Sequence, residues 1–326
     1  MLDDLLIQFF DAQARRETSV YLLLNGKKTL SILYAAMVHH QLQWLQLYPT
    51  LERENYQAAI TRLRAQGLLV ATDAGLVLAD DAAQKAAAKR VPLPSHYHPD
   101  LAVHEFAPRL QLAVQVLSEA SYHERHYRPI VQDWAVQQAV RRWWRHCDAA
   151  QAQATLQAAF AALPQQSGDA LVRRFVGHQF VGSAKSLTLA DQLAEVDRLA
   201  EFISVIAAGD LATPWAQLWG GRRALAPASA YQALTLIVRG YSRTQVAAQL
   251  RLKPSTINEH LLTVAIEGAV LPVAQLYTPA QRQMLQHQGA VADYRALLAA
   301  VPECDFFQVR LYQILQFQGR WPDGDA

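Results

Sequence analysis

The segment GYSRTQVAAQLRLKPSTINEHLL (240–262) constrains the fold of this chain more than any other part of it. Ser242 can cap a helix that runs to about Leu250. After a short turn, Pro254 fixes φ at the start of a second helix, and the Ser-Thr pair that follows can supply its cap. The sequence therefore predicts two short helices joined by a turn of three to four residues.

Apolar residues within this segment recur at the spacing that two crossing helices need. Ala247 falls where the helices would cross, and only a small side chain fits there. Arg251 stands in the turn, where many such units place glycine, and His260 is expected to be half-buried. The residues expected to form one small core are Val246, Leu250, Leu252, Ile257 and Leu261. This pattern is typical of a helix-turn-helix unit.

The second helix would keep a polar face free, from which side chains can reach base edges or phosphates in a major groove. Residues 222–253 contain only basic charges, which gives this region a local positive excess. Glu259 opposes DNA binding unless it accepts from a cytosine amine. The residues that we expect to contact DNA are Arg222, Arg223, Arg243, Arg251, Lys253, Ser255, Thr256, Asn258 and Glu259.

The rest of the chain also favours helix. It has 326 residues, 52% of them apolar, a net charge of +2 and few glycines and prolines. We expect a mainly α, multi-domain helical protein with a winged-helix-like N-terminal domain. Helices are expected over 2–14, 29–47 (capped by Thr29) and 51–66 (capped by Thr50), followed by a small β-hairpin over 68–80 with a turn at Thr72–Gly75. A plain α+β subdomain without a ligand fits the same pattern.

These patterns divide the chain into domains. The expected boundaries are 1–90 for the winged-helix-like domain, 91–99 for a proline-containing linker, 100–227 for a helical middle domain, 228–320 for the helix-turn-helix domain and 321–326 for a tail.

Residues 233–271, and most specifically KPSTINEHL (253–261), resemble the helicase-type helix-turn-helix domain found in some RecQ-like helicases and in YpbB-like proteins. The helices expected over 277–288, 294–302 and 306–315 follow the order of that family. Residues 15–36 resemble the N-terminal region of YpbB-like proteins more loosely, at Tyr21, Gly26, Lys27 and Lys28. Lys27 and Lys28 therefore join the residues expected to contact DNA.

The resemblance implies a non-enzymatic DNA-binding accessory protein that partners a RecQ-type helicase in DNA repair or recombination. Two other classes remain open. Residues 240–262 also resemble the DNA-binding unit of LuxR-type transcription regulators, although those usually end soon after this helix, whereas residues 263–326 follow here. The third hypothesis is a protein–protein adaptor whose helix-turn-helix no longer binds DNA.

Other chemistries have little support in the sequence. NGKKT (25–29) resembles the end of a phosphate-binding loop, but Tyr21 occupies the position of the required glycine, so we expect no ATPase activity. The five histidines between 96 and 126 match no common zinc spacing, and no cofactor, metal or small-molecule substrate is expected. VRRWWRH (140–146) places aromatic rings beside cations, a combination that can stack the bases of single-stranded DNA, but the favoured expectation is one tryptophan in a core and the other at a domain interface. No apolar run is long enough to span a membrane, and we expect a cytoplasmic protein.

Overall fold

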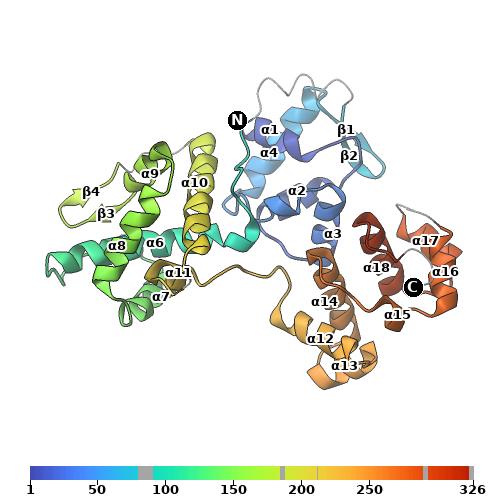
Figure 1. Ribbon diagram of the computed structural model, residues 1–326. Helices are drawn as coiled ribbons and strands as arrows, with labels where there is room; N and C mark the ends of the chain where they lie inside the picture. The colour runs from blue at the N-terminus through green and yellow to red at the C-terminus, as the bar shows by residue number, and fades with distance from the viewer. Residues whose placement is uncertain (80–90, 184–187, 211, 289–292, 323–326) are drawn as a thin grey trace. The chain divides into compact units, whose positions relative to one another are not determined.

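The computed structural model describes residues 1–79, 91–183, 188–210, 212–288 and 293–322 (Figure 1). The described residues are mainly α-helical, with two small antiparallel hairpins, which confirms the expected fold class. The expected domain boundary at residue 90 and part of the expected tail at 321–326 lie outside the described residues. The chain forms two compact units, the first made of residues 1–21 and 43–223 and the second of residues 22–42 and 224–326.

The N-terminal part of the first unit joins short helices to a hairpin. Its elements are α1 (Leu2–Leu6), a 3-10 turn (Ile7–Phe9), α4 (Arg53–Ala65), β1 (Leu69–Thr72) and β2 (Gly75–Leu78). Helix α2 (Glu17–Leu24) and a second 3-10 turn (Leu42–Trp44) span the divisions between the units. The hairpin is confirmed, and Thr72 pairs with Gly75 across its turn. Gly75 has a φ of 139°, and a Cβ there would lie 2.1 Å from the carbonyl oxygen of Arg15. Only glycine fits this close approach.

Three expected helices are shorter in the structure, and two expected caps act differently. The helix expected over 2–14 ends early because the backbone of Arg15 pairs with Leu76 of the hairpin. The helix expected over 29–47 is α3 (Leu30–Val38), which ends before His40 at a positive φ of 53°. Thr29 is its N-cap residue, but its side chain makes no capping hydrogen bond. The helix expected over 51–66 is α4, whose N-cap is Glu52 and not Thr50.

The remainder of the first unit is helical apart from one hairpin that the sequence did not predict, β3 (Val176–Gly177) with β4 (Phe180–Val181). Its helices are a 3-10 turn (Pro99–Leu101), α6 (Val103–Ser121), α7 (Trp134–Trp144), α8 (Ala149–Ala161), α9 (Gln165–Val172), α10 (Leu189–Ala208) and α11 (Pro214–Trp219).

Tryptophans join the helices of this unit. The indole N–H of Trp215 donates to Ala152 at 2.8 Å, and that of Trp143 donates to Pro214 at 2.7 Å. Both rings are buried with their N–H groups satisfied, as a low-dielectric core requires.

The second unit is arranged around one central helix, α14 (Pro254–Glu267), which packs against α3, α12, α13 and α18 (Figure 1). Leu261–Ile266 are consecutively buried, so this half of α14 contacts protein on all sides. The remaining helices are α12 (Ala228–Val238), α13 (Arg243–Leu250), α15 (Val273–Leu276), α16 (Pro279–Gln286), α17 (Tyr294–Ala300) and α18 (Phe306–Phe317).

Helix α3 is an integral part of this unit although it lies far from the other helices in sequence. The guanidinium of Arg310 on α18 lies 4.0 Å from the ring centre of Tyr34. The rings of His40 and Phe317 are 5.0 Å apart. These contacts attach the N-terminal segment to the C-terminal helices.

We predict that Ala247→Leu destabilises the second unit by about 1–3 kcal/mol, because Ala247 is only 5% exposed on a helix that packs against α12 and α14. The neighbouring Ala248 is exposed, so Ala248→Leu is the matched control and should change stability by less than about 0.5 kcal/mol. Chemical denaturation of both variants measures the difference. Equal stability of the two would contradict the packing described here.

Candidate nucleic-acid interface

Helices α13 and α14 meet in a tight turn whose geometry follows from the local sequence. Ser242 caps α13 as expected, in a reciprocal capping box with Gln245. Arg251 has φ 55° and ψ 39°, the left-handed conformation that glycine usually supplies at a helix end. Lys253 is the N-cap of α14 and Pro254 follows it as the first helical residue. The expectation that Ser255 or Thr256 caps the helix is wrong, because both lie inside it.

The expected core between the two helices is present. Val246, Ile257 and Leu261 are fully buried, while Leu250 and Leu252 are half-buried at its edge. Because the inward positions are fixed, the exposed N-terminal half of α14 presents Ser255 and Glu259 to solvent. This is the half of such a helix that enters the major groove in helix-turn-helix proteins.

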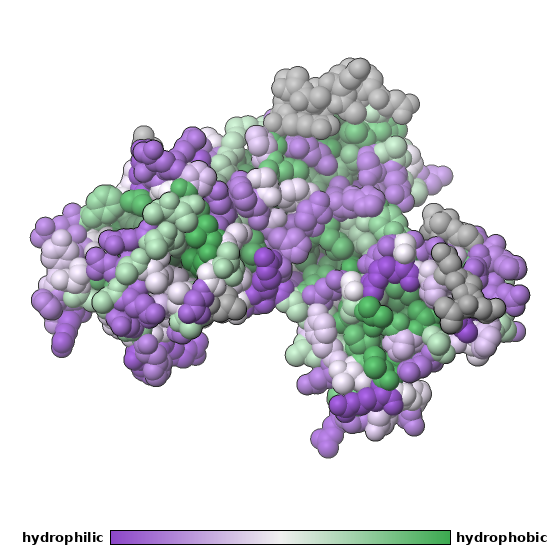
Figure 2. Space-filling model, viewed as in Figure 1, coloured by the Kyte–Doolittle hydropathy of each residue, from purple (hydrophilic) through white to green (hydrophobic). Residues whose placement is uncertain are grey.

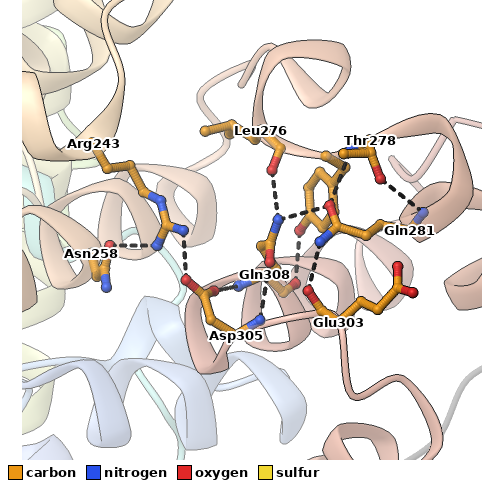
Figure 3. Close-up of polar contacts among 9 residues, drawn as sticks. Arg243, Asn258, Leu276, Thr278, Gln281, Glu303, Asp305 and Gln308 are labelled. Atoms are coloured by element: carbon orange, nitrogen blue, oxygen red, sulfur yellow. Dashed lines mark hydrogen bonds and ion pairs between the residues drawn. The ribbon is translucent and has the colours of Figure 1, made fainter.

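Arg243 and Asn258 are hydrogen-bonded to each other (Figure 3). Both are therefore less available for contacts with DNA than the sequence suggested. One guanidinium nitrogen of Arg243 donates to Oδ1 of Asn258 at 2.9 Å, and another donates to Oδ2 of Asp305 at 2.5 Å. The same guanidinium lies 4.4 Å from the ring centre of Phe307. Arg243 thus connects α13, α14 and α18, and Asp305 offsets its charge. Asn258 is half-buried, whereas its position one residue from Ile257 had predicted an exposed side chain.

Asp305 also organises the helices that follow (Figure 3). It accepts from the backbone N–H of Gln308, whose side-chain oxygen accepts from the N–H of Asp305 in return. The amide of Gln308 also donates to the carbonyl of Leu276 at 2.9 Å. This network fixes the start of α18 and the end of α15, and so fixes the carboxylate that holds Arg243.

The six basic residues counted over 222–253 separate into two groups in the structure. Arg222 pairs with Asp100 at 2.7 Å, and Arg223 donates to carbonyls at the end of α11; both belong to the first unit. Within the second unit, no ion pair with a described residue involves the three exposed residues Arg239, Arg251 and Lys253. These three cations carry the positive charge beside α14.

The second unit also brings Lys28 next to the exposed half of α14. A groove of about 750 Å³ lies between the start of α3 and α14. Lys28 and Ser31 line one side of it, and Ser255, Asn258 and Glu259 line the other. Lys27 and Lys28 are both exposed. The sequence named these lysines only through a resemblance, and no local pattern places residues 27–31 beside residues 255–259.

His260, at the edge of this groove, is half-buried as expected. Its Nε2 lies 2.9 Å from the hydroxyl of Ser229, and burial lowers the pKa of the imidazole below its usual value. A lowered pKa favours the neutral ring at neutral pH, so His260 adds no positive charge to the groove. Figure 2 shows hydrophilic and apolar residues mixed on the visible face of this unit.

The comparison with protein families agrees with this geometry. Residues 229–313 match the model of a helix-turn-helix domain. The matched helix-turn-helix domain begins in α12 and ends within α18, so it includes α13, α14 and Asp305 but not α3. No curated protein and no solved structure matches the chain.

Among the described residues, no cluster of three or more His, Cys, Asp or Glu side chains could hold a metal ion. None of the described helices has the length and apolar character needed to cross a membrane.

The turn residue Arg251 provides a test that separates stability from binding. A non-glycine residue in the left-handed region costs about 1 kcal/mol, so Arg251→Gly should stabilise the protein by about 0.5–1 kcal/mol. The same change removes an exposed cation beside α14, so duplex DNA should bind more weakly. Denaturation curves and duplex-binding curves measure the two effects. Arg251→Ala is the control, since it removes the charge without relieving the backbone; it should weaken binding equally without the gain in stability.

Proposed function

We propose that this protein is a non-enzymatic DNA-binding protein that places the N-terminal half of α14 in the major groove. The observation that carries the proposal is the exposed helix start, with Ser255 and Glu259 next to Lys253 and Arg251 and with Lys28 across the groove. Cations on both sides of such a helix can contact the phosphates that border a major groove. Backbone amides at the start of α14 add donors of the same kind.

The same geometry favours weak binding with little sequence preference. Sequence is read best by bidentate side chains, such as Arg on guanine or Asn on adenine. Asn258 is held by Arg243, and Arg243 is held by Asp305, so neither is free for this purpose. Ser255, Thr256 and Glu259 remain for base contacts. Affinity would therefore depend mostly on phosphate contacts, which carry no sequence information.

We predict that replacing Lys28 and Lys253 together with Ala weakens binding to duplex DNA and makes it less dependent on salt. Each phosphate contact contributes about −0.9 to the slope of log K against log salt, so the double variant should lose about 1.8. Fluorescence anisotropy at several salt concentrations measures the slope. Arg53→Ala, on an exposed helix start of the first unit, is the control and should leave it unchanged.

Two outcomes would overturn the proposal. Nanomolar binding to one defined sequence, absent on scrambled DNA, would favour a transcription regulator. If the Lys28/Lys253 variant keeps the wild-type affinity and the wild-type slope of log K against log salt, this groove is not the DNA-binding surface. That result would favour the hypothesis of a protein–protein adaptor. Asn258 is left intact in this design because its replacement would also release Arg243.

We further propose that the protein acts with a RecQ-type helicase in DNA repair or recombination. The support is the resemblance of residues 233–271 and 15–36 to YpbB-like proteins. An accessory DNA-binding module raises the effective concentration of DNA at a bound motor, which increases its apparent affinity without new contacts on the motor itself. The proposal includes no catalysis by the chain itself, since the sequence offers no phosphate-binding loop.

We predict that a tagged full-length chain isolates a RecQ-type helicase from the native cell, and that the purified chain hydrolyses no ATP. Mass spectrometry of the captured proteins and a DNA-stimulated ATPase assay check the two statements. The Lys28/Lys253 variant should capture the helicase as well as the wild type does. Capture without any such helicase would contradict the partnership while leaving the DNA-binding proposal intact.

A further inference from the structure

The first unit contains a second basic surface, unrelated in sequence to the helix-turn-helix domain. Residues 122–146 carry five arginines, all exposed: Arg125, Arg128, Arg141, Arg142 and Arg145. Across the described part of the chain, none of the five forms an ion pair with another residue. The two acids of this stretch already accept backbone hydrogen bonds, Asp133 from Val136 and Glu124 from His126. With five arginines against two acids, the stretch carries a net positive charge.

Two of these arginines, Arg125 and Arg141, line a cleft of about 740 Å³ between α6 and α7. We call it the α6–α7 cleft. Val116 on α6 and Val140 on α7 contribute apolar surface to it, and Tyr127, Arg125, Arg141 and Trp144 line it with aromatic and cationic groups. The volume lies within the range of about 300–1,000 Å³ that is usual for ligand-binding pockets. Trp144 is half-buried here, while its neighbour Trp143 belongs to the core.

Further aromatic rings are exposed beside the cleft. Trp134 is 65% exposed, and the guanidinium of Arg141 lies 5.3 Å from its ring centre. Tyr122 is 63% exposed and stacks on His178 with ring centres 4.4 Å apart. Exposed aromatic rings beside cationic groups are the kind of surface on which nucleic-acid bases can stack.

Side-chain hydrogen bonds from α6 and α7 hold the loop that carries these groups. Gln115 on α6 is 4% exposed; its amide donates to the carbonyl of Arg128, and its oxygen accepts from the N–H of Ile130. Gln137 on α7 donates to the carbonyl of Val131. The loop is therefore anchored to both helices of the cleft. Such preorganisation reduces the entropy lost when a ligand binds.

We propose that the α6–α7 cleft binds single-stranded nucleic acid, with bases stacked on Trp144 and Tyr127 and phosphates contacted by Arg125 and Arg141. Proteins that hold single strands without sequence preference combine a positive groove with aromatic platforms in this way. A duplex fits the cleft less well, because its bases are already stacked and cannot reach the rings. Glu124, which also lines the cleft, is ionised, since the N–H of His126 lowers the pKa of its carboxyl group. The neighbouring arginines outnumber it.

The test uses the full-length protein and labelled dT and U oligonucleotides of about 12 nucleotides, within the range of single-strand sites of about 4–16. Wild-type protein should bind dT, and comparison with U shows whether DNA or RNA is preferred. Arg125→Glu with Arg141→Glu should weaken dT binding about tenfold or more. Arg53→Glu is the control; it lies in the first turn of α4, where an acid is tolerated, and should bind as the wild type does.

Stacking is tested separately from charge. Trp144→Ala should weaken dT binding about tenfold, and Trp144→Phe should recover most of it, because a phenylalanine ring can still stack. Bound dT should also quench tryptophan fluorescence in the wild type, and quench it less in Trp144→Phe. Thermal melts show which variants are folded. If Trp144→Ala does not fold, the charge-reversal pair and the Trp144→Phe quenching decide the question.

The outcome is distinguishable from that of the helix-turn-helix domain. The Lys28/Lys253 variant should keep its dT affinity while losing duplex affinity, and the Arg125/Arg141 variant should do the reverse. Unchanged dT binding in the Arg125/Arg141 variant would overturn the proposal. So would displacement of dT by an equally charged poly-glutamate peptide at the same concentration as by unlabelled dT, since the cleft would then select only for negative charge.

Discussion

The second unit depends on the burial of α14. A helix of this length usually has one apolar face, yet Leu261–Ile266 are buried consecutively and have protein on every side. Each fully buried large apolar side chain, such as Leu262, stabilises the folded state by about 1.5–3 kcal/mol. This half of the helix therefore forms the core of the unit. The exposed N-terminal half is then rigidly continuous with the core. A DNA-contacting surface at the end of such a helix is positioned by packing rather than by its own side chains.

This arrangement explains why α3 belongs to the same unit. Helices α12, α13 and α18 cover part of α14, and α3 covers another part. The contact between Arg310 and Tyr34 reinforces that packing. As a consequence, Lys28 lies at the border of the groove beside Ser255. The domain recognised by the family match is thus completed by residues near the other end of the sequence.

Local features could be predicted from the sequence because they depend on residues that are close together in it. The Ser242 cap, the helix start at Pro254 and the buried Ala247 depend on residues within a few positions of one another. The turn at Thr72–Gly75 could be predicted for the same reason. The early end of the N-terminal helix could not be predicted, because the backbone of Arg15 pairs with Leu76, which lies far along the chain.

The candidate site shows the same limit. Arg243 and Asn258 both lie in the predicted unit, but the ion pair that withdraws Arg243 comes from Asp305, which no helical period connects to it. Arg222 and Arg223 appeared to extend the basic stretch in the sequence. In the structure Arg222 pairs with Asp100, and Arg223 donates to carbonyls at the end of α11. Counting basic residues along the sequence therefore overestimated the positive charge beside α14. The groove between Lys28 and Ser255 was missed because it depends on a contact between distant segments.

The net charge of the whole chain is only +2, and several of its acids have structural roles. Aspartates serve as structural acceptors at helix starts, where the helix dipole and free N–H groups stabilise a negative charge. This is their role in α7, α8, α17 and α18, through Asp133, Asp148, Asp293 and Asp305. Arginines in α7 and in the loop before it have no such internal role and remain at the surface. A chain that is nearly neutral as a whole can therefore present basic surfaces, because its charges are unevenly distributed: residues 122–146 hold five arginines and two acids, and residues 222–253 hold no acid.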